Sequence, residues 1–193
     1  MSPPRRVSFV GSHLGPWIVE RIEAVRGEGL PGAERVAVAE SESPSMLPPP
    51  AWVLCGVTGH ERYVTRPEHE ALVALQPPLG RPEATSAALI PIRKSDEWWS
   101  FAQDERREIF EERSSHIASS LKYLPAVARR LHHSRELGEE FDFLTWFEYA
   151  PQESNGFEEL AAALRETEEW SYVEREVDIR LSFEPTAVSR QPA

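Results

Sequence analysis

Hydrophobic and polar positions follow two different periods along this chain, and the period changes at Pro125. Before it, Ile117, Leu121 and Leu124 continue an apolar stripe at helical spacing that begins near Ile109. Proline cannot continue a helix, and it favours extended geometry at the residue before it. After Pro125, successive residues alternate between two faces, as in a strand. The pattern therefore predicts a helix that ends near Leu124 and is followed directly by a strand.

This change of period has a geometric consequence for His116 and Arg129. His116 lies on the predicted helix, and Arg129 shares one face of the predicted strand with Val127 and Leu131. The chain climbs roughly 12 Å from His116 to the end of the helix and returns by roughly 13 Å along the strand. The two side chains are therefore expected at the same height on facing surfaces, with room for a flat cofactor between them. Spacing alone does not require this, because such a histidine is more often structural and such an arginine more often solvent-facing or ion-paired.

The rest of the pattern predicts an alternation of strands and helices. Strands are expected over 52–64, 85–92, 126–134, 141–149 and 172–183, and helices over 67–75 and 157–168. A helical region is expected to begin at Asp96, to be continued from Asp104 by an acidic first turn, and to run to about Leu124. Segments 7–10 and 17–25 are compatible with two strands or with a strand and a helix. Residues 26–51, rich in Gly, Pro, Ser and Glu, are expected to form a loop.

From residue 85 onward the predicted order is strand, helix, strand, strand, helix, strand, which is the ferredoxin-like unit. Residues 52–76 look like a truncated copy of the same unit. The sequence therefore predicts an α+β protein with helices on one face of an antiparallel sheet. The expected division is an N-terminal subdomain over 1–84, a C-terminal subdomain over 85–183 and a disordered tail over 184–193.

Composition and charge narrow the classes of function. Hydrophobic residues make up 40% of the chain and charged residues 27%, as in soluble globular proteins. The net charge of −11 argues against a nucleic-acid or anionic-membrane partner, although an arginine in a pocket can still attract a small anion. Cys55 is the only cysteine, so no internal disulfide framework or Cys-based zinc site is expected. The pair Arg5 and Arg6 is not followed by an unbroken apolar segment, and we expect a cytoplasmic protein.

Several segments carry a further set of motifs. They are Ala88-Leu-Ile-Pro-Ile-Arg-Lys-Ser, Trp98-Trp99, Asp104-Glu-Arg-Arg-Glu-Ile-Phe-Glu, His116-Ile, Tyr123-Leu-Pro-Ala-Val-Ala-Arg129, Phe141-Asp-Phe-Leu-Thr-Trp-Phe-Glu-Tyr-Ala-Pro151 and Thr167-Glu-Glu-Trp-Ser-Tyr-Val-Glu-Arg-Glu-Val-Asp-Ile-Arg-Leu181. Together they resemble the chlorite dismutase family, most closely its short, N-terminally trimmed dimeric lineage. The resemblance runs from about Trp52 to Leu181.

The resemblance implies a haem b cofactor, with His116 as the proximal iron ligand and Arg129 as the mobile distal arginine. The haem would be held without covalent attachment, and the chain has no Cys-x-x-Cys-His to attach it. Glu169, with Lys94 beside it, would accept a hydrogen bond from the second nitrogen of His116. From the residues alone, Glu168 and Glu169 are also compatible with the acidic end of a helix, where the helix dipole disfavours them.

Two more positions follow from the resemblance. Gln76 matches the distal glutamine of the short lineage and is expected to hydrogen-bond Arg129, although a polar cap at a helix end before Pro77 explains it equally well. Trp98 and Trp99 match residues of the haem pocket, whereas core packing is the more common role for tryptophan. The other histidines, including the adjacent pair at 132 and 133, are expected to be structural or solvent-facing.

The implied activity is the conversion of chlorite to chloride and dioxygen, with formation of an O–O bond, in a homodimer. Coproheme decarboxylase, a related enzyme with the same fold, is the main alternative. Its members usually lack the distal arginine, so Arg129 argues against it. A non-catalytic haem-binding protein is the third reading.

Overall fold

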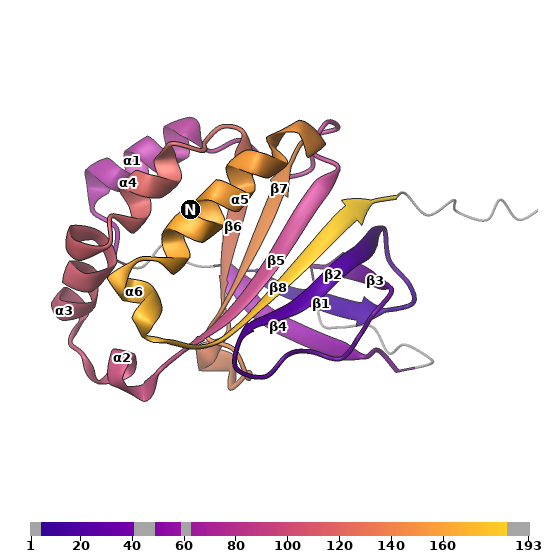
Figure 1. The fold of residues 1–193 in the computed structure, drawn as a ribbon, viewed down its shortest axis with the longest axis horizontal. Coiled ribbons are helices and arrows are strands. Elements are labelled where there is room, and N and C mark those ends of the chain that lie inside the picture. Colours follow the sequence, from indigo (N-terminus) through magenta and orange to yellow (C-terminus); the bar gives the residue numbers. More distant parts are fainter. Residues whose placement is uncertain (1–4, 41–48, 59–62, 185–193) are drawn as a thin grey trace, which may run out of the picture.

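The chain forms an antiparallel eight-stranded barrel with helices packed against one side of it (Figure 1). The computed structural model describes residues 5–40, 49–58 and 63–184. The strands are β1 (Arg6–Ser12), β2 (Trp17–Arg26), β3 (Arg35–Ala39), β4 (Trp52–Thr58), β5 (Ser86–Lys94), β6 (Val127–His133), β7 (Phe143–Tyr149) and β8 (Val173–Phe183). The helices are α1 (Arg66–Leu75), α2 (Asp96–Ser100), α3 (Gln103–Arg107), α4 (His116–Leu121), α5 (Ser154–Arg165) and α6 (Glu168–Ser171), with a π-helical turn η1 (Glu108–Arg113) and 3-10 turns η2 (Arg135–Leu137) and η3 (Pro151–Glu153).

The barrel joins strands from both halves of the chain. Its order is β1-β3-β2-β8-β5-β7-β6-β4, and pairing of β4 with β1 closes it. The predicted α+β class with an antiparallel sheet is therefore confirmed. The two predicted subdomains share this barrel, since β2 pairs with β8 and β4 with β6. From β5 onward the order is strand, helices, strand, strand, helix, strand.

The N-terminal part contains a strand that the sequence analysis missed. Residues 26–51 were expected to be a loop, but β3 lies within them and pairs with β1 and β2. Its sequence Arg-Val-Ala-Val-Ala alternates, and Val36 is fully buried. Segment 17–26 is a strand, which decides between the two alternatives for it. The expected tail, apart from Glu184, lies outside the described residues, as do 41–48 and 59–62.

The helical region predicted from residue 96, and continued from Asp104 to about Leu124, is divided in the structure into α2, α3, η1 and α4. Ser95 caps α2 by accepting a hydrogen bond from the backbone N–H of Trp98 at 3.2 Å. Ser115 then adopts a left-handed conformation with φ 50°, which a continuous right-handed helix cannot contain. As a result, His116 begins a new helix rather than lying inside a long one.

Two apolar layers hold the fold together. One fills the barrel, where residues such as Phe9, Leu89 and Ile179 are fully buried. The other lies between the outer face of the sheet and the helices, where Phe147 of β7 and Phe157 of α5 pack with ring centroids 5.0 Å apart. Each such side chain contributes about 1.5–3 kcal/mol by leaving water. Figure 1 shows α5 running along this outer face.

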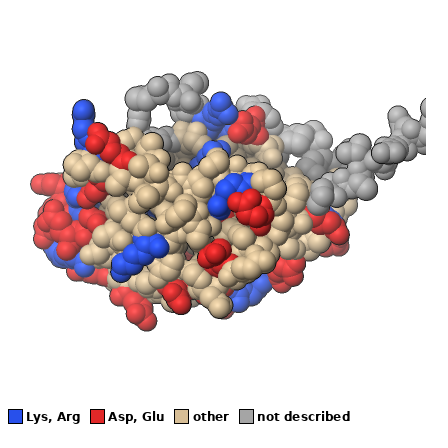
Figure 2. All heavy atoms as spheres, turned by 90° about the horizontal axis from the view of Figure 1, so that it is seen from above, with Lys and Arg blue, Asp and Glu red and all other residues tan. Residues whose placement is uncertain are grey.

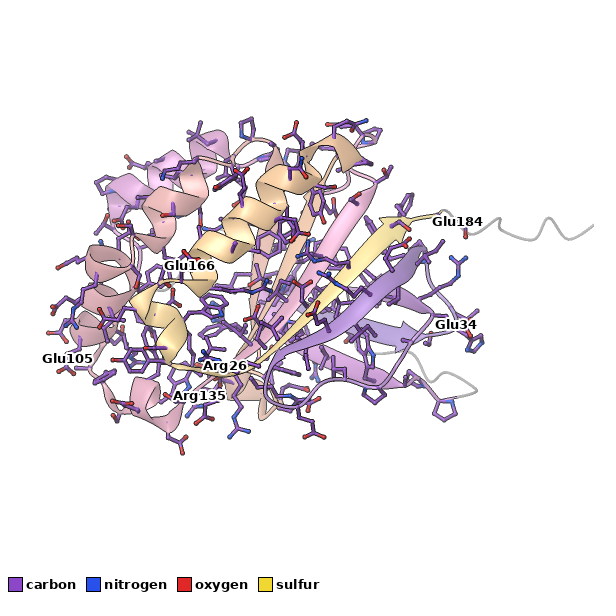
Figure 3. The ribbon with its side chains drawn as sticks, viewed as in Figure 1. Arg26, Glu34, Glu105, Arg135, Glu166 and Glu184 are labelled. Carbon is purple, nitrogen blue, oxygen red and sulfur yellow. The ribbon has the colours of Figure 1, made fainter. Side chains whose placement is uncertain are left out.

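The surface is strongly acidic at one end. Figure 2 shows red side chains gathered at the end of the molecule where α3 lies, and the exposed acidic residues there include Asp104, Glu105 and Glu108. Glu105 and Glu184 are labelled at opposite ends of the molecule in Figure 3. Within the described ranges, no helix is long and apolar enough to cross a membrane.

Candidate active site

A cavity of about 340 Å³ lies between the outer face of the sheet and the helices α4, α5 and α6. This volume falls within the range of ordinary cofactor and small-molecule sites. Much of its wall is apolar, including Ile90, Leu131, Phe143, Phe147, Phe157 and Leu160. His116 and Arg129 both lie on the wall, so the structure brings together the two residues that the change of period placed opposite each other.

His116 is held from behind by a buried ion pair. Its Nδ1 lies 2.6 Å from Oε2 of Glu169, while Lys94 Nζ donates to Oε1 of Glu169 at 2.8 Å and to its backbone carbonyl at 3.1 Å. The side chains of Lys94 and Glu169 are only 1% and 5% exposed. Lys94 Nζ also lies 4.6 Å from the centroid of the Trp98 ring. The predicted group of Lys94, Glu169 and His116 is therefore present as one connected set of contacts.

The ionisation of Glu169 fixes the tautomer of His116. Burial opposes the charged carboxylate, but the charge of Lys94 and the hydrogen bond with His116 outweigh it and lower the pKa of Glu169 to about 2. An ionised carboxylate can only accept, so Nδ1 of His116 carries the proton and donates. In the neutral imidazole, Nε2 is then the ring nitrogen with a free lone pair, and this is the form that binds a metal.

The environment of Glu168 and Glu169 differs from the helix end that the sequence suggested. Both residues belong to the first turn of the short helix α6, where the helix dipole favours carboxylates. The backbone N–H of Glu169 donates to Oγ of Ser114 at 2.9 Å, which ties α6 to the segment just before His116.

Arg129 lies on β6, where it pairs with Phe147 of β7. Nε2 of Gln76 donates to the backbone carbonyl of Arg129 at 2.8 Å. The expected contact between these two residues is thus present, and it is made to the main chain. Gln76 is also the C-cap of α1, and its own N–H donates to the carbonyl of Leu72 at 2.8 Å. The side chain of Gln76 therefore makes its bond to the main chain of β6, and the role of a distal glutamine that orients the guanidinium of Arg129 stays a prediction.

The tryptophan pair divides between two environments. Trp98 is 1% exposed and lies on the cavity wall, and its Nε1 has no hydrogen-bond partner in the described part of the chain. Trp99 is not among the wall residues. Its Nε1 donates to Oδ2 of Asp142 at 3.1 Å, its ring stacks on Phe143, and the guanidinium of Arg135, labelled in Figure 3, lies 4.1 Å from the ring centroid.

The adjacent histidines His132 and His133 also lie in different environments. His132 is 2% exposed, its Nδ1 lies 3.1 Å from the carbonyl of Leu144, and its ring meets Phe9 edge-on. Burial lowers the pKa of His132 to about 4, so it is neutral at neutral pH. His133 is buried on the cavity wall, which the sequence analysis did not anticipate. The available signal was its strand face, since residues 129, 131 and 133 point to the same side.

Comparisons with known proteins place this chain in a family. Residues 40–183 match the sequence model of the chlorite dismutase family. A chlorite dismutase from Ideonella dechloratans is 31% identical over 86 residues, which cover 45% of this chain and 28% of that protein. The matched stretch thus spans less than a third of that relative.

Solved structures extend the likeness to nearly the whole chain. The crystal structure of dimeric chlorite dismutases from Nitrobacter winogradskyi is 56% identical, with a TM-score of 0.85 over 92% of this chain and 99% of that one. A mutant chlorite dismutase from Candidatus Nitrospira defluvii, 23% identical, shares the fold with a TM-score of 0.66 over 92% of this chain and 91% of that one. Since the family match covers well over half of the residues, this chain belongs to the chlorite dismutase family.

Proposed function

We propose that this protein is a haem b chlorite dismutase that converts one chlorite into one chloride and one dioxygen. The observation that carries the proposal is the placement of His116 and Arg129 on the wall of one largely apolar cavity. An imidazole with a free lone pair can hold an iron, and a guanidinium can hold the anion that reacts there.

The residues present fit a haem. Among residues 5–40, 49–58 and 63–184, no cluster of three or more His, Cys, Asp or Glu could hold a bare metal ion. Two imidazoles, His116 and His133, line this largely apolar cavity, and so few ligands instead suit a metal that arrives inside a macrocycle. The unpaired, buried Nε1 of Trp98 supports the same reading, because such donors normally have a partner and a bound group would supply one. Bound haem would supply the redox-active iron at which the Cl–O bond breaks and the O–O bond forms.

The residues around His116 would tune this iron. His116 would hold it through Nε2, while Glu169 keeps the proton on Nδ1 and makes the imidazole a stronger donor. Lys94 keeps Glu169 ionised in a buried site, since an unpaired carboxylate would tend to protonate there. The three residues together hold one ring orientation and one tautomer.

Arg129, which also lines the cavity, would bind the substrate. Its guanidinium is permanently charged and presents several N–H donors in a plane, so it can attract chlorite and retain the chlorine–oxygen fragment until the O–O bond forms. Gln76 would hold the main chain beneath it. The apolar wall excludes water and thereby strengthens the attraction between guanidinium and anion.

The remaining expectations belong to the same proposal. The likeness to a structure described as dimeric supports a homodimer. The order of elements from β5 supports a ferredoxin-like unit in the C-terminal part. A truncated N-terminal copy, with a boundary near residue 84, is part of the same proposal. We also propose a cytoplasmic location, and neither nucleic acid nor a membrane as partner.

An oxygen electrode tests the function. The haem-loaded protein should evolve about one dioxygen per chlorite consumed, with chloride as the other product. Haem binding without oxygen release would favour the haem-binding alternative. Loss of carbon dioxide from bound coproheme on addition of peroxide, again without oxygen release from chlorite, would favour the decarboxylase.

A further inference from the structure

The place of His116 depends on a segment that the proposed mechanism does not use, namely η1 and the serines after it. Ser115, with φ 50° and ψ 38°, prevents η1 and α4 from forming one helix. A new helix leaves its first backbone N–H groups without acceptors inside the helix. His116 is the first residue of α4, so the group that accepts from these N–H groups also holds the backbone under the imidazole.

That group is the carboxylate of Glu111. Its Oε2 accepts from the backbone N–H of Ile117 at 2.6 Å, and its Oε1 accepts from that of Ala118 at 3.2 Å. The usual cap would be the residue directly before the helix, but the side chain of Ser115 makes no capping hydrogen bond. The cap of α4 therefore comes from the preceding element.

The neighbours of Glu111 contact the imidazole and its acceptor. The ring of Phe110 stacks on that of His116, with centroids 4.3 Å apart and planes at 23°. Oγ of Ser114, which is buried, accepts the backbone N–H of Glu169. Residues 110–114 thus contact the imidazole of His116, the backbone that follows it, and the main chain of Glu169, which accepts its hydrogen bond.

We propose that Glu111 is a positioning residue for His116: by capping α4 it sets the angle at which the imidazole meets Glu169 and the cavity. Glu111 is not among the wall residues, so it acts through His116. Without the cap, the first turn of α4 frays, because its N–H groups lose their acceptor. The imidazole moves with its own backbone, and the 2.6 Å bond between Nδ1 and Glu169 lengthens.

The first test needs no haem. In the full-length apo protein, the Nδ1 proton in this short bond should give a strongly downfield proton NMR resonance. Glu111→Ala should move it upfield or broaden it beyond detection. Glu111→Gln keeps one side-chain acceptor, so its resonance should lie between those of the wild type and Glu111→Ala. Glu112→Ala is the matched control, since Glu112 is an exposed neighbour in η1 and should leave the resonance unchanged.

The second test rests on the proposed function. With haem bound, Glu111→Ala should release it to a scavenger about 10-fold faster than Glu112→Ala and shift the iron–histidine vibration, again with Glu111→Gln between them. If Glu111→Ala does not fold, the comparison of Glu111→Gln with Glu112→Ala tests the inference by itself. The inference is overturned if the tested Glu111 variant matches Glu112→Ala in the NMR resonance and in haem release. If the wild type binds no haem but the NMR shifts appear, the proposed function fails and the positioning role stands.

Discussion

The side chain of Gln76 donates a hydrogen bond to the backbone carbonyl of Arg129, 2.8 Å away, and so connects the end of α1 to strand β6. The two residues are 53 positions apart in the chain. Because the contact is to the main chain, Gln76 constrains where β6 runs, whatever direction the guanidinium takes.

Gln76→Ala should therefore loosen β6 at Arg129 without removing the cation. The lost bond costs about 1 kcal/mol, and we expect turnover to fall several-fold while the haem absorption spectrum stays unchanged. Steady-state oxygen release and absorption spectra measure both effects. Gln103→Ala, on the exposed face of α3, is the control and should behave as wild type. Equal turnover in both variants would contradict the role given to Gln76.

Arg129→Ala should abolish most of the chlorite turnover and keep the haem. Removal of donors aimed at a reacting anion typically lowers turnover by roughly 100-fold or more. Arg129→Lys keeps the charge but loses the planar set of donors, so its turnover should lie between those of the wild type and Arg129→Ala. Arg93→Ala, exposed on β5, is the control. A fully active Arg129→Ala would show that substrate binding does not need this guanidinium.

His116→Ala should remove the iron ligand. We expect the variant to fail to retain haem through gel filtration, or to retain it without a five-coordinate spectrum. The other histidine on the cavity wall, His133, lies on β6 and lacks the contact with Glu169 that orients His116. His13→Ala, on an exposed turn, serves as control and should bind haem as wild type does. A normal spectrum in His116→Ala would remove the ligand assignment.

Variants of the buried Lys94–Glu169 pair can separate two effects: its contribution to the free energy of unfolding, and the effect of Glu169 on His116 as an iron ligand. Glu169→Gln leaves Lys94 buried without its counter-charge and should cost about 3–5 kcal/mol in the free energy of unfolding. Adding Lys94→Met should recover much of that loss, because no buried charge then remains. The double variant should still show the altered iron–histidine vibration, since the acceptor for Nδ1 is changed. Urea unfolding measures the first effect and vibrational spectra the second. If the double variant regained both the stability and the wild-type vibration, the two effects would not be separate.

His132 should make the protein less stable in mild acid. Burial lowers its folded-state pKa to about 4 from an ordinary 6.5, so between these values the unfolded chain binds more protons than the folded one. Stability is therefore expected to be constant above pH 6.5 with respect to this group and to fall as pH drops to 4, by about 3 kcal/mol in total. Urea unfolding of the apo protein across this range measures it.

His132→Leu should remove that slope, because no titrating group remains at this buried position. His13→Ala, which removes an exposed histidine, should keep the wild-type slope. An unchanged slope in His132→Leu would assign the acid sensitivity to other groups. The ionisation of Glu169 affects stability in a lower pH range, from its ordinary pKa of 4.5 down to about 2, which overlaps the range of His132 only near pH 4.

Local patterns in the sequence were enough for α1, α5 and strands β5 to β8, and for the reversal between His116 and Arg129. These features depend on residues close together in the chain, whose apolar periods and proline positions report local geometry directly. The roles of Lys94, Glu169 and Gln76 came instead from resemblance.

Only the tertiary structure decided how the site is supported. It broke the expected long helix at Ser115, placed Trp98 on the cavity wall but not Trp99, and joined Glu169 to Ser114 across 55 positions of sequence. Such contacts depend on where distant segments meet once the barrel has closed. The spacing of apolar residues along a helix does not say which distant segments will pack against it, because the same spacing is compatible with many arrangements of its neighbours.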